Sequence, residues 1–234
     1  MYEEIIENRG ITRLCHFTKA KNLPFILGNG EDSSNGIVAN NFIKDTSFLQ
    51  KIDEQRYDKH EDYICTSVQY PNCLYFSTVQ NKRKKDLFRE WVILEIDPKV
   101  INDTTKFCPV NAATKGGRLI EAGEEGFENL FAGMVEGKRT IQRNMFRPSN
   151  LPTDIQAEVL IYESVLKDYI KGIIFPNETR AFQECVRLDL CGIDVENYEI
   201  ICSEEMFDRN ELLSHLEMGE IPEERILERE EYGL

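Results

Sequence analysis

Short apolar segments with few helices between them limit the fold of this chain more than any other feature of its sequence. The segment Trp91–Ile96 is almost entirely apolar and has the length of a buried strand. Further strands are expected at 11–18, 63–68, 73–79, 156–162, 172–175 and 198–203. Many short strands with few helices between them predict an α+β fold with largely antiparallel sheets.

The expected helices are mostly short and peripheral. Residues 178–190 have an amphipathic pattern, with Asn177 as the N-cap and Gly192 as the stop signal. Shorter helices are expected at 23–27, at 82–90 and, on the outside of the fold, within 205–230. No repeat or linker divides the sequence, so we expect a single domain over 1–234 with an acidic helical C-terminal segment at about 205–234.

Two polar segments interrupt this pattern. Residues 31–47 are interpreted as a loop or lid, and residues 102–155 as a long irregular stretch that contains several glycines. Because long structureless loops are unusual in compact domains and are often functional when they occur, 102–155 is a candidate for a binding segment.

The charge distribution matters more than the total. The net charge of −14 argues against nucleic-acid binding, since phosphates need local Lys and Arg. Basic residues nevertheless cluster at 82–85 and from Lys138 to Arg147, while 217–230 is densely acidic. The second cluster interleaves cations with Phe146, as single-stranded nucleic acid requires, although a solvated helix face would have the same composition.

The sequence gives no sign of a membrane or secreted protein. No stretch reaches the roughly 18 apolar residues of a membrane span, and the N-terminus lacks a signal-peptide pattern. Seven cysteines without a Cys-x-x-Cys pair favour free thiols in apolar strands, Cys65 among them. We therefore expect a cytoplasmic protein without membrane contact.

Glu158 is the first candidate for chemistry. In the strand-like segment 156–162 it alternates with Ala157 and Val159, so it enters a buried strand directly after a loop. A carboxylate there is poorly solvated unless it has a partner, although an edge-strand glutamate that points to water would fit the same pattern.

Other chemistries have weaker support. Glu95 and Asp97, with Glu158, would suit a magnesium-dependent nuclease, but no histidine lies nearby in sequence, and we expect no metal. No phosphate-binding glycine motif of the Rossmann or P-loop type is present. A non-catalytic acidic binding module also remains open at this point. Taken singly, three other polar residues also have structural interpretations. His16 would be a hydrogen-bonded histidine within a strand, Arg56 a surface arginine and Asn22 a helix cap.

An ordered set of short motifs resembles the DarT toxins, ADP-ribosyltransferases that modify bases in single-stranded DNA. The order and spacing agree from about residue 11 to residue 175. The matching segments are His16-Phe17-Thr18 followed by Asn22–Leu27, Arg56 before Ile64–Ser67, Tyr70-Pro71-Asn72 with Tyr75-Phe76, Trp91–Leu94, and Thr153–Leu160. Ile155 stands where relatives often carry proline.

The resemblance implies an ADP-ribosyltransferase-like fold, with two largely antiparallel sheets around an NAD cleft and helices outside. It implies NAD as a substrate rather than a bound cofactor. By this similarity Glu158 and Arg56 are the catalytic residues, and His16, Thr18, Asn22 and Tyr75 or Phe76 line the NAD pocket. Arg139, Arg143 and Arg147, in the segment before Glu158, are expected to bind the DNA phosphates.

The same resemblance implies a mechanism and a partner. Loss of nicotinamide builds positive charge on the ribose, which Glu158 would stabilise while it takes a proton from the attacking base. Arg56 would pair with the NAD phosphates or with Glu158. The base must be unstacked, which favours single-stranded DNA. A toxin of this kind has a cognate antitoxin that removes ADP-ribose, of the NADAR or macrodomain type.

Tyr70-Pro71-Asn72 and the segment 107–113 resemble the guanine-modifying branch more than the thymine-modifying one. The alternatives on the same fold are transfer of ADP-ribose to RNA, to protein or to water.

Overall fold

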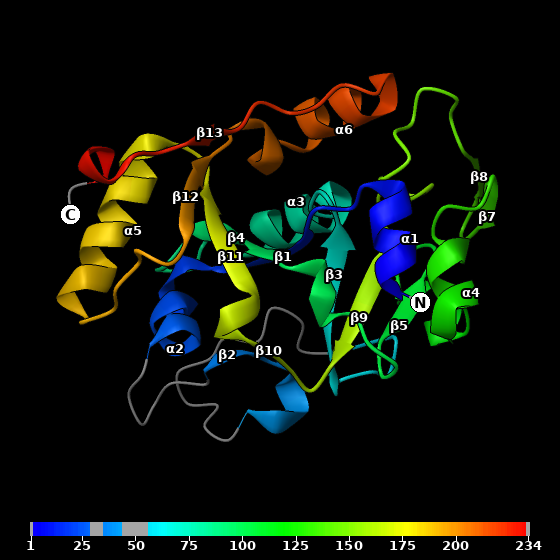
Figure 1. Ribbon diagram of the computed structural model, residues 1–234, viewed down its shortest axis with the longest axis horizontal. Coiled ribbons are helices and arrows are strands. Elements are labelled where there is room, and N and C mark those ends of the chain that lie inside the picture. Colours follow the sequence, from blue (N-terminus) through cyan, green and yellow to red (C-terminus); the bar gives the residue numbers. More distant parts are fainter. Residues whose placement is uncertain (1, 29–34, 44–55, 233–234) are drawn as a thin grey trace.

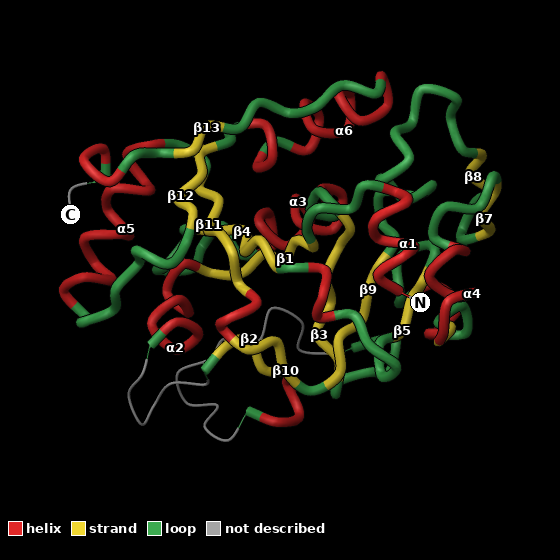
Figure 2. Tube along the Cα trace, in the orientation of Figure 1, coloured by secondary structure: helices red, strands yellow, loops and turns green. Residues whose placement is uncertain are grey.

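The computed structural model describes residues 2–28, 35–43 and 56–232. Strands lie at the centre and helices at the periphery (Figure 2). The strands are β1 (Leu14–Lys19), β2 (Gly36–Val38), β3 (Tyr63–Val68), β4 (Trp91–Ile96), β5 (Lys106–Cys108), β6 (Glu121–Ala122), β7 (Met134–Glu136), β8 (Thr140–Gln142), β9 (Glu158–Tyr162), β10 (Ser164–Leu166), β11 (Ile170–Phe175), β12 (Glu199–Cys202) and β13 (Arg225–Ile226). The α-helices are α1 (Tyr2–Arg9), α2 (Leu23–Leu27), α3 (Cys73–Lys82), α4 (Gly123–Asn129), α5 (Glu178–Leu190) and α6 (Arg209–Met218).

The central strands form two half-sheets joined by a short junction. In the described part of the chain, nine strands follow the order β13-β12-β11-β4-β1-β3-β9-β5-β6, and β11 with β12 is the parallel pair among antiparallel ones. β1 pairs with β4 over its whole length but with β3 only through Leu14 and Cys15. The half-sheet that ends at β1 and the one that begins at β3 therefore separate beyond Cys15. The predicted α+β fold with largely antiparallel sheets is confirmed.

Alternation along β1 divides the core between its two faces. Leu14 packs with α1, α2 and α5 in the largest hydrophobic cluster, whereas Cys15 packs with α3 and α6 in a second one. Figure 1 shows α3 and α6 on one side of β1 and β4, and α2 on the other. Because successive side chains point to opposite faces, His16 and Thr18 lie on the face of Leu14, and Phe17 lies on the face of α3.

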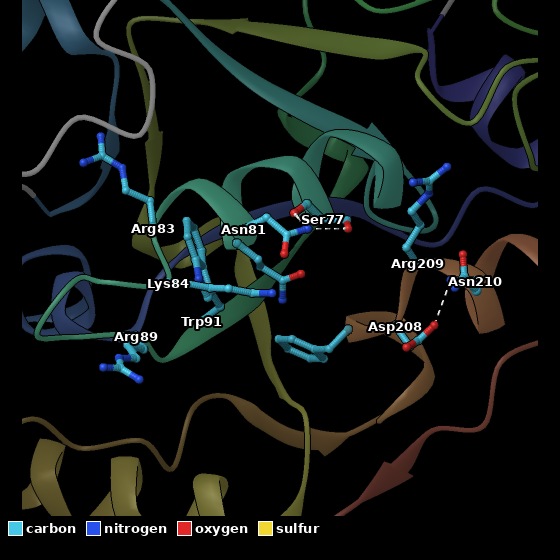
Figure 3. A pocket seen from close by; sticks show the side chains of 11 residues that line it. Ser77, Asn81, Arg83, Lys84, Arg89, Trp91, Asp208, Arg209 and Asn210 are labelled. Carbon is cyan, nitrogen blue, oxygen red and sulfur yellow. Dashed lines mark hydrogen bonds between the residues drawn. The ribbon is translucent and has the colours of Figure 1, made fainter.

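The α3 face of the fold is not completely closed. A pocket of about 580 Å³ opens between the C-terminal end of α3, the start of β4 and the N-terminal end of α6 (Figure 3). Trp91 and Phe207 belong to its lining. The pocket therefore lies on the opposite side of β1 from Thr18.

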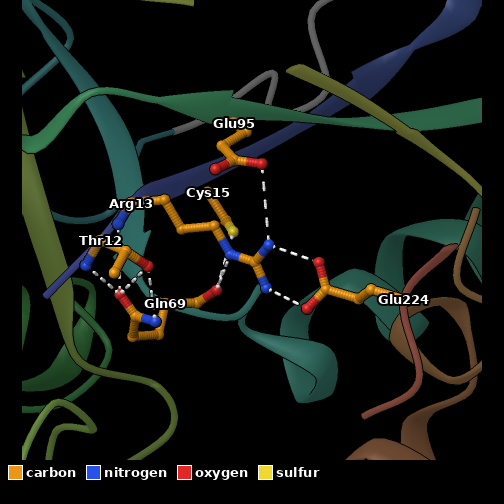
Figure 4. Close-up of polar contacts among 6 residues, drawn as sticks. All are labelled: Thr12, Arg13, Cys15, Gln69, Glu95 and Glu224. Carbon is orange, nitrogen blue, oxygen red and sulfur yellow. Dashed lines mark hydrogen bonds and ion pairs between the residues drawn. The ribbon is translucent and has the colours of Figure 1, made fainter. Parts of the chain in front are cut away.

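The C-terminal segment is attached to the junction between the half-sheets. Arg13, directly before β1, donates through Nη1 and Nη2 to the two carboxylate oxygens of Glu224, at 2.5 and 2.6 Å (Figure 4). Its Nε donates to the carbonyl oxygen of Gln69 at 2.8 Å, and Glu95 lies 3.7 Å from Nη1. After α6 the chain then runs back along one side of the molecule towards α5 (Figure 1).

Several predicted elements agree with the structure. The predicted strands at 63–68 and 91–96 coincide with β3 and β4, and the predicted helix 178–190 coincides with α5. The Asn177 side chain accepts from the backbone N–H of Arg180 at 3.0 Å, as a cap should. The expected strands at 11–18, 156–162, 172–175 and 198–203 correspond to β1, β9, β11 and β12 with shifted ends.

Three predictions of secondary structure were wrong. Residues 73–79 form helix α3 rather than a strand, because Cys73, Phe76 and Val79 recur on one helical face after the Asn72 cap. The predicted helix 82–90 is a turn-rich loop beyond Lys82. The segment 102–155 is not irregular, since it contains β5, β6, α4, β7 and β8.

Two further predicted segments agree only in part. The expected helices within 205–230 include α6, but β13 follows them. Within the proposed loop or lid 31–47, the structure describes residues 35–43, which contain β2. Residues 31–34 and 44–47 lie outside the described residues. No helix in the described ranges is long and apolar enough to cross a membrane.

Candidate active site

Glu158, the first residue of β9, is a buried carboxylate with fixed partners. Its side chain is enclosed, with the residue 7% exposed. Oε1 accepts from Nδ2 of Asn111 at 2.8 Å and from the backbone N–H of Ala112 at 3.1 Å. The pairing of Cys108 with Glu158 between β5 and β9 brings the 111–112 turn beside the carboxylate. The prediction that Glu158 enters a buried strand is therefore confirmed, and the reading of a water-facing edge residue is wrong.

Burial sets the protonation of this carboxyl group. Desolvation raises the pKa of Glu158 to about 7, although hydrogen bonds from the Cys65 thiol and the Ala112 N–H and the charge of Arg56 act in the opposite direction. Near neutral pH the group is thus divided between its acid and its carboxylate forms. A carboxyl group with this pKa can both accept and release a proton at physiological pH.

Arg56 is held beside Glu158 by another acid. Its Nε and Nη2 donate to the two carboxylate oxygens of Asp58, at 2.9 and 2.5 Å, and Nη1 donates to the carbonyl oxygen of Tyr63 at 3.1 Å. Burial alone would raise the pKa of Asp58, but the guanidinium of Arg56 holds it below its ordinary value. The expected direct pair between Arg56 and Glu158 is replaced by this pair with Asp58, and Arg56 acts on Glu158 through its charge.

His16 lies where the two half-sheets separate. Its Nδ1 is 2.9 Å from the carbonyl oxygen of Cys65. A carbonyl oxygen only accepts, so Nδ1 carries the proton. Burial lowers the pKa of His16, and the charge of Arg56 lowers it further, so the imidazole is neutral at pH 7. His16 thereby connects β1 to β3 beyond the last backbone pair.

Thr18 and Asn22 form a small polar site on the same face as His16. Asn22 donates through Nδ2 to Oγ1 of Thr18 at 3.0 Å. Its Oδ1 is buried and has no hydrogen-bond partner among residues 2–28, 35–43 and 56–232. An unpaired buried acceptor is rare and suits a ligand that brings a donor, such as a ribose hydroxyl group. These residues fit the NAD pocket that the sequence predicts.

The two aromatic candidates for the NAD pocket lie in different environments. Phe76 is 1% exposed and stacks on Phe17 at 4.5 Å in the core cluster of α3. The prediction that Phe76 contacts NAD has no support in this position, because the ring is enclosed by protein. Tyr75 is half-buried at the start of the same helix and packs against Phe17 at 6.0 Å, on the opposite face of β1 from His16 and Thr18, so its contact with NAD stays a prediction.

Two of the three predicted DNA-binding arginines are engaged within the protein. Arg143 donates to the carbonyl oxygens of Leu151 and Pro148, at 2.8 and 2.6 Å, and Arg147 donates to that of Pro152 at 2.7 Å. They hold the loop that enters β9. Both arginines are half-buried and Arg139 is exposed, and contact of the three with DNA phosphates stays a prediction.

The proposed metal cluster does not form. Glu95 on β4 lies beside Arg13, and Glu158 is on β9, three strand positions away in the sheet. Within the described ranges, no group of three or more His, Cys, Asp and Glu side chains is placed to hold a metal ion. The arrangement that motivated a nuclease mechanism is thus absent from this part of the chain.

Three functional candidates were missed from sequence. Asn111 and Asp58 are polar residues of loops, and Cys65 was interpreted as a small apolar residue of a strand. Each contacts Glu158 or Arg56. For Asn111 the available signal was the resemblance of segment 107–113 to one branch of the family, because a contact with Glu158 so far along the chain follows from the fold. Asp58 lies only two residues after Arg56, and its proximity in sequence was the signal for that pair.

The fold matches solved structures of one kind of enzyme. The similar structures include Thermus sp. 2.9 DarT in complex with NAD+ (TM-score 0.56, 14% identity, 84% of this chain and 98% of that one) and the same protein with ADP-ribosylated ssDNA (0.57, 13%, 85% and 97%). Thermosipho africanus DarTG in complex with ADP-ribose is also similar (0.54, 16%, 84% and 51%). No curated protein sequence matches this chain. The fold is therefore that of the DarT ADP-ribosyltransferases.

The sequence model of one family matches residues 15–208. The fold and this match define the chain as an NAD-dependent ADP-ribosyltransferase. The matching family is described as DarT, ssDNA thymidine ADP-ribosyltransferase. The chain belongs to the DarT family, whose members modify single-stranded DNA with NAD as substrate. The matched region contains Glu158, Arg56 and His16 and ends directly before α6.

Proposed function

We propose that this chain transfers ADP-ribose from NAD to guanine in single-stranded DNA, with Glu158 as the catalytic residue. The observation that carries the role of Glu158 is a buried carboxyl group with a pKa of about 7, fixed by Asn111 and Ala112. Guanine as the acceptor rests on the resemblance of Tyr70-Pro71-Asn72 and of segment 107–113 to the guanine-modifying branch. Structural glutamates seldom occupy such positions, because an ionised carboxylate is poorly stabilised there.

Glu158 would act on charge and on a proton. When the bond from ribose to nicotinamide breaks, positive charge develops at the ribose, and the carboxylate stabilises it through a hydrogen bond to a ribose hydroxyl group. The same group then accepts the proton that the attacking base nitrogen loses. A carboxyl group whose pKa lies near the working pH is suited to both roles.

Arg56 and His16 would place the substrate rather than react. The bidentate pair with Asp58 fixes the guanidinium of Arg56, which can then face a diphosphate without reorganisation. His16 is neutral and anchored through Nδ1, so it offers a hydrogen-bonding ring to the ribose. Thr18 and Asn22 supply the polar wall of the same pocket.

The DNA would approach over the loop that leads into β9. Arg139 is exposed between β7 and β8, and Met145 and Phe146 are 88% and 64% exposed farther along the loop. Exposed apolar and aromatic side chains on a segment that also carries cations favour unstacked bases over a duplex. This arrangement supports single-stranded DNA as the acceptor.

A substitution at Glu158 tests the catalytic proposal. Glu158→Gln keeps an acceptor for Asn111 and Ala112, and we expect transfer of labelled ADP-ribose to a single-stranded oligonucleotide to fall by about 100-fold or more. Glu136→Gln, an exposed acid on β7, serves as the matched control and should retain activity. Normal transfer by the Glu158 variant would refute the assignment.

A second experiment tests the acceptor. The enzyme is incubated with NAD and each of four homopolymeric oligonucleotides, and mass spectrometry measures the addition of ADP-ribose. The proposal expects a mass increase on the guanine strand. Modification of thymine alone would instead agree with the description of the matching family. RNA and protein substrates in parallel reactions test the other acceptors.

We propose in addition that the enzyme is the cytoplasmic toxin of a toxin–antitoxin pair. Because an enzyme that modifies DNA would harm the cell that makes it, the cell needs an opposing activity. The partner would be a hydrolase that removes ADP-ribose from the base. The structural similarity to a DarTG protein supports a partner of this kind. Expression of the wild-type chain should arrest growth, and Glu158→Gln should not. Normal growth with active enzyme would contradict the toxin role.

A further inference from the structure

A polar pocket lies apart from the Glu158 site, on the α3 side of β1 and β4. Its volume is about 580 Å³, within the range of pockets for nucleotide-sized ligands. Figure 3 shows Arg83, Lys84 and Arg89 on one side of it, and Arg209 and Asn210 on the other. The remaining lining residues are Ser77, Gln80, Asn81, Trp91, Phe207 and Asp208.

The pocket concentrates positive charge in an acidic protein. The chain carries a net charge of −14, yet four of the eleven lining residues are Lys or Arg. The one acid, Asp208, is already engaged, because its Oδ1 accepts from the backbone N–H groups of Asn210 and Glu211 at 2.7 and 3.0 Å. Neither Lys84 nor Arg209 forms an ion pair within residues 2–28, 35–43 and 56–232. The pocket therefore attracts anions.

Aromatic rings form part of the same lining. Trp91 is the only tryptophan of the chain, and the ammonium group of Lys19 lies 4.3 Å from its ring centroid. Phe207 packs against Phe76 at 5.7 Å, which holds this side of the pocket rigid. Gln80 and Asn81 add amide groups that can donate and accept. Cations, rings and amides together are the combination that binds a phosphate with its adjoining base.

The position of the pocket separates it from the NAD site. Phe17 packs against Phe76 and Trp91 on the α3 face of β1, whereas His16 and Thr18 lie on the opposite face. A ligand in the pocket consequently cannot be the nucleotide that reacts beside Glu158.

We propose that this pocket binds a nucleotide unit of single-stranded nucleic acid through its backbone phosphate, outside the site of modification. Lys84 and Arg209 contact the phosphate, and the base lies against Phe207 and the part of Trp91 that lines the pocket, the residue being 7% exposed. The volume of about 580 Å³ admits one nucleotide, and the pocket is open enough for the strand to continue on either side of it. This inference goes beyond the proposed function and does not depend on the role of Glu158.

The position of Trp91 gives a direct assay. A thymidine strand of about eight nucleotides is titrated into the protein without NAD, and the intrinsic fluorescence of Trp91 reports occupancy of the pocket. We expect saturable quenching in the wild type. The double variant Lys84→Glu, Arg209→Glu should bind about tenfold more weakly or worse, with a shallower dependence on salt.

Controls keep this test decisive. Lys99→Glu reverses an exposed charge at the far end of β4 and should leave the affinity unchanged. The neutral variant Lys84→Gln should weaken binding less than the reversal, and unchanged melting temperatures confirm that the variants fold. Equal affinity of the double variant and the wild type would overturn the proposal. Thymidine monophosphate or inorganic phosphate that binds as tightly as the strand would also overturn it, because the site would then serve free nucleotides or phosphate.

Discussion

Replacement of Glu158 by glutamine should stabilise the protein at alkaline pH while it removes activity. The pKa of Glu158 is about 7 in the folded protein against an ordinary value of 4.5. The folded state thus binds the proton more tightly than the unfolded state does. Its stability is unaffected by this group well below pH 4.5, falls as the pH rises from 4.5 to 7, and stays reduced above pH 7.

The size of the effect follows from the two pKa values. Each tenfold change in proton affinity corresponds to about 1.36 kcal/mol, so ionised Glu158 lowers the free energy of unfolding by about 3 kcal/mol at pH 8. At pH 5 the same group lowers it by less than about 1 kcal/mol. Glutamine is neutral at both values. The stability gained by Glu158→Gln should therefore be about 2–3 kcal/mol larger at pH 8 than at pH 5.

Urea unfolding followed by Trp91 fluorescence measures this difference. The melting temperature provides a second readout, because 1 kcal/mol corresponds to about 2–4 °C in a domain of this size. Subtracting the change in unfolding free energy at pH 5 from that at pH 8 removes any effect of the glutamine amide that does not depend on pH. Glu136→Gln, at an exposed position, should show no such dependence. If Glu158→Gln raised the free energy of unfolding equally at pH 5 and pH 8, or lowered it at pH 8, the raised pKa of Glu158 would be refuted.

Three further outcomes are expected. Cys65→Ala should raise the pH midpoint of kcat/KM by about 0.5–1 pH unit, because the hydrogen bond from the thiol that lowers the pKa of Glu158 is lost. Cys65→Ser keeps a hydrogen-bond donor and should shift the midpoint less. Glu224→Ala should destabilise the fold by about 3 kcal/mol in urea unfolding, since it leaves Arg13 buried without its bidentate partner, while Glu223→Ala should not. Dialysis against EDTA should leave the transfer rate unchanged, and a loss of activity restored by a divalent cation would contradict catalysis by side chains alone.

The sequence predicted those elements whose local signals and tertiary environment agree. Trp91–Ile96 is apolar throughout and becomes a central strand, and 178–190 has both a cap and a glycine stop. Residues 73–79 misled because their aromatic and β-branched side chains favour strands, whereas packing of Phe76 in the core requires a helix. The strands within 102–155 have two or three residues each, and too few side chains alternate to reveal them.

The site was predictable only in its reacting groups. Glu158 could be inferred because a charged carboxylate at the start of a buried strand is poorly solvated. Such a conflict between a residue type and its environment is typical of functional positions. Asn111 and Cys65 reduce this conflict because they donate hydrogen bonds to the carboxylate, but one lies in a polar loop and the other in an apolar strand, where the sequence does not mark them. Arg143 and Arg147 could not be separated from phosphate-binding arginines, because composition does not reveal which cations a loop uses to satisfy its own carbonyl oxygens.

The location of Glu158 follows from the way the half-sheets meet. β1 and β3 share only two backbone pairs, and beyond them the imidazole of His16 and the carbonyl of Cys65 complete the connection. The thiol of the same Cys65 donates to Glu158, so one residue links His16 to the buried carboxylate. Arg13, at the other end of the junction, is fixed by Glu224, which lies beyond the region that defines the family. The junction between the half-sheets is therefore held at this end by a contact from the C-terminal segment, outside the region 15–208.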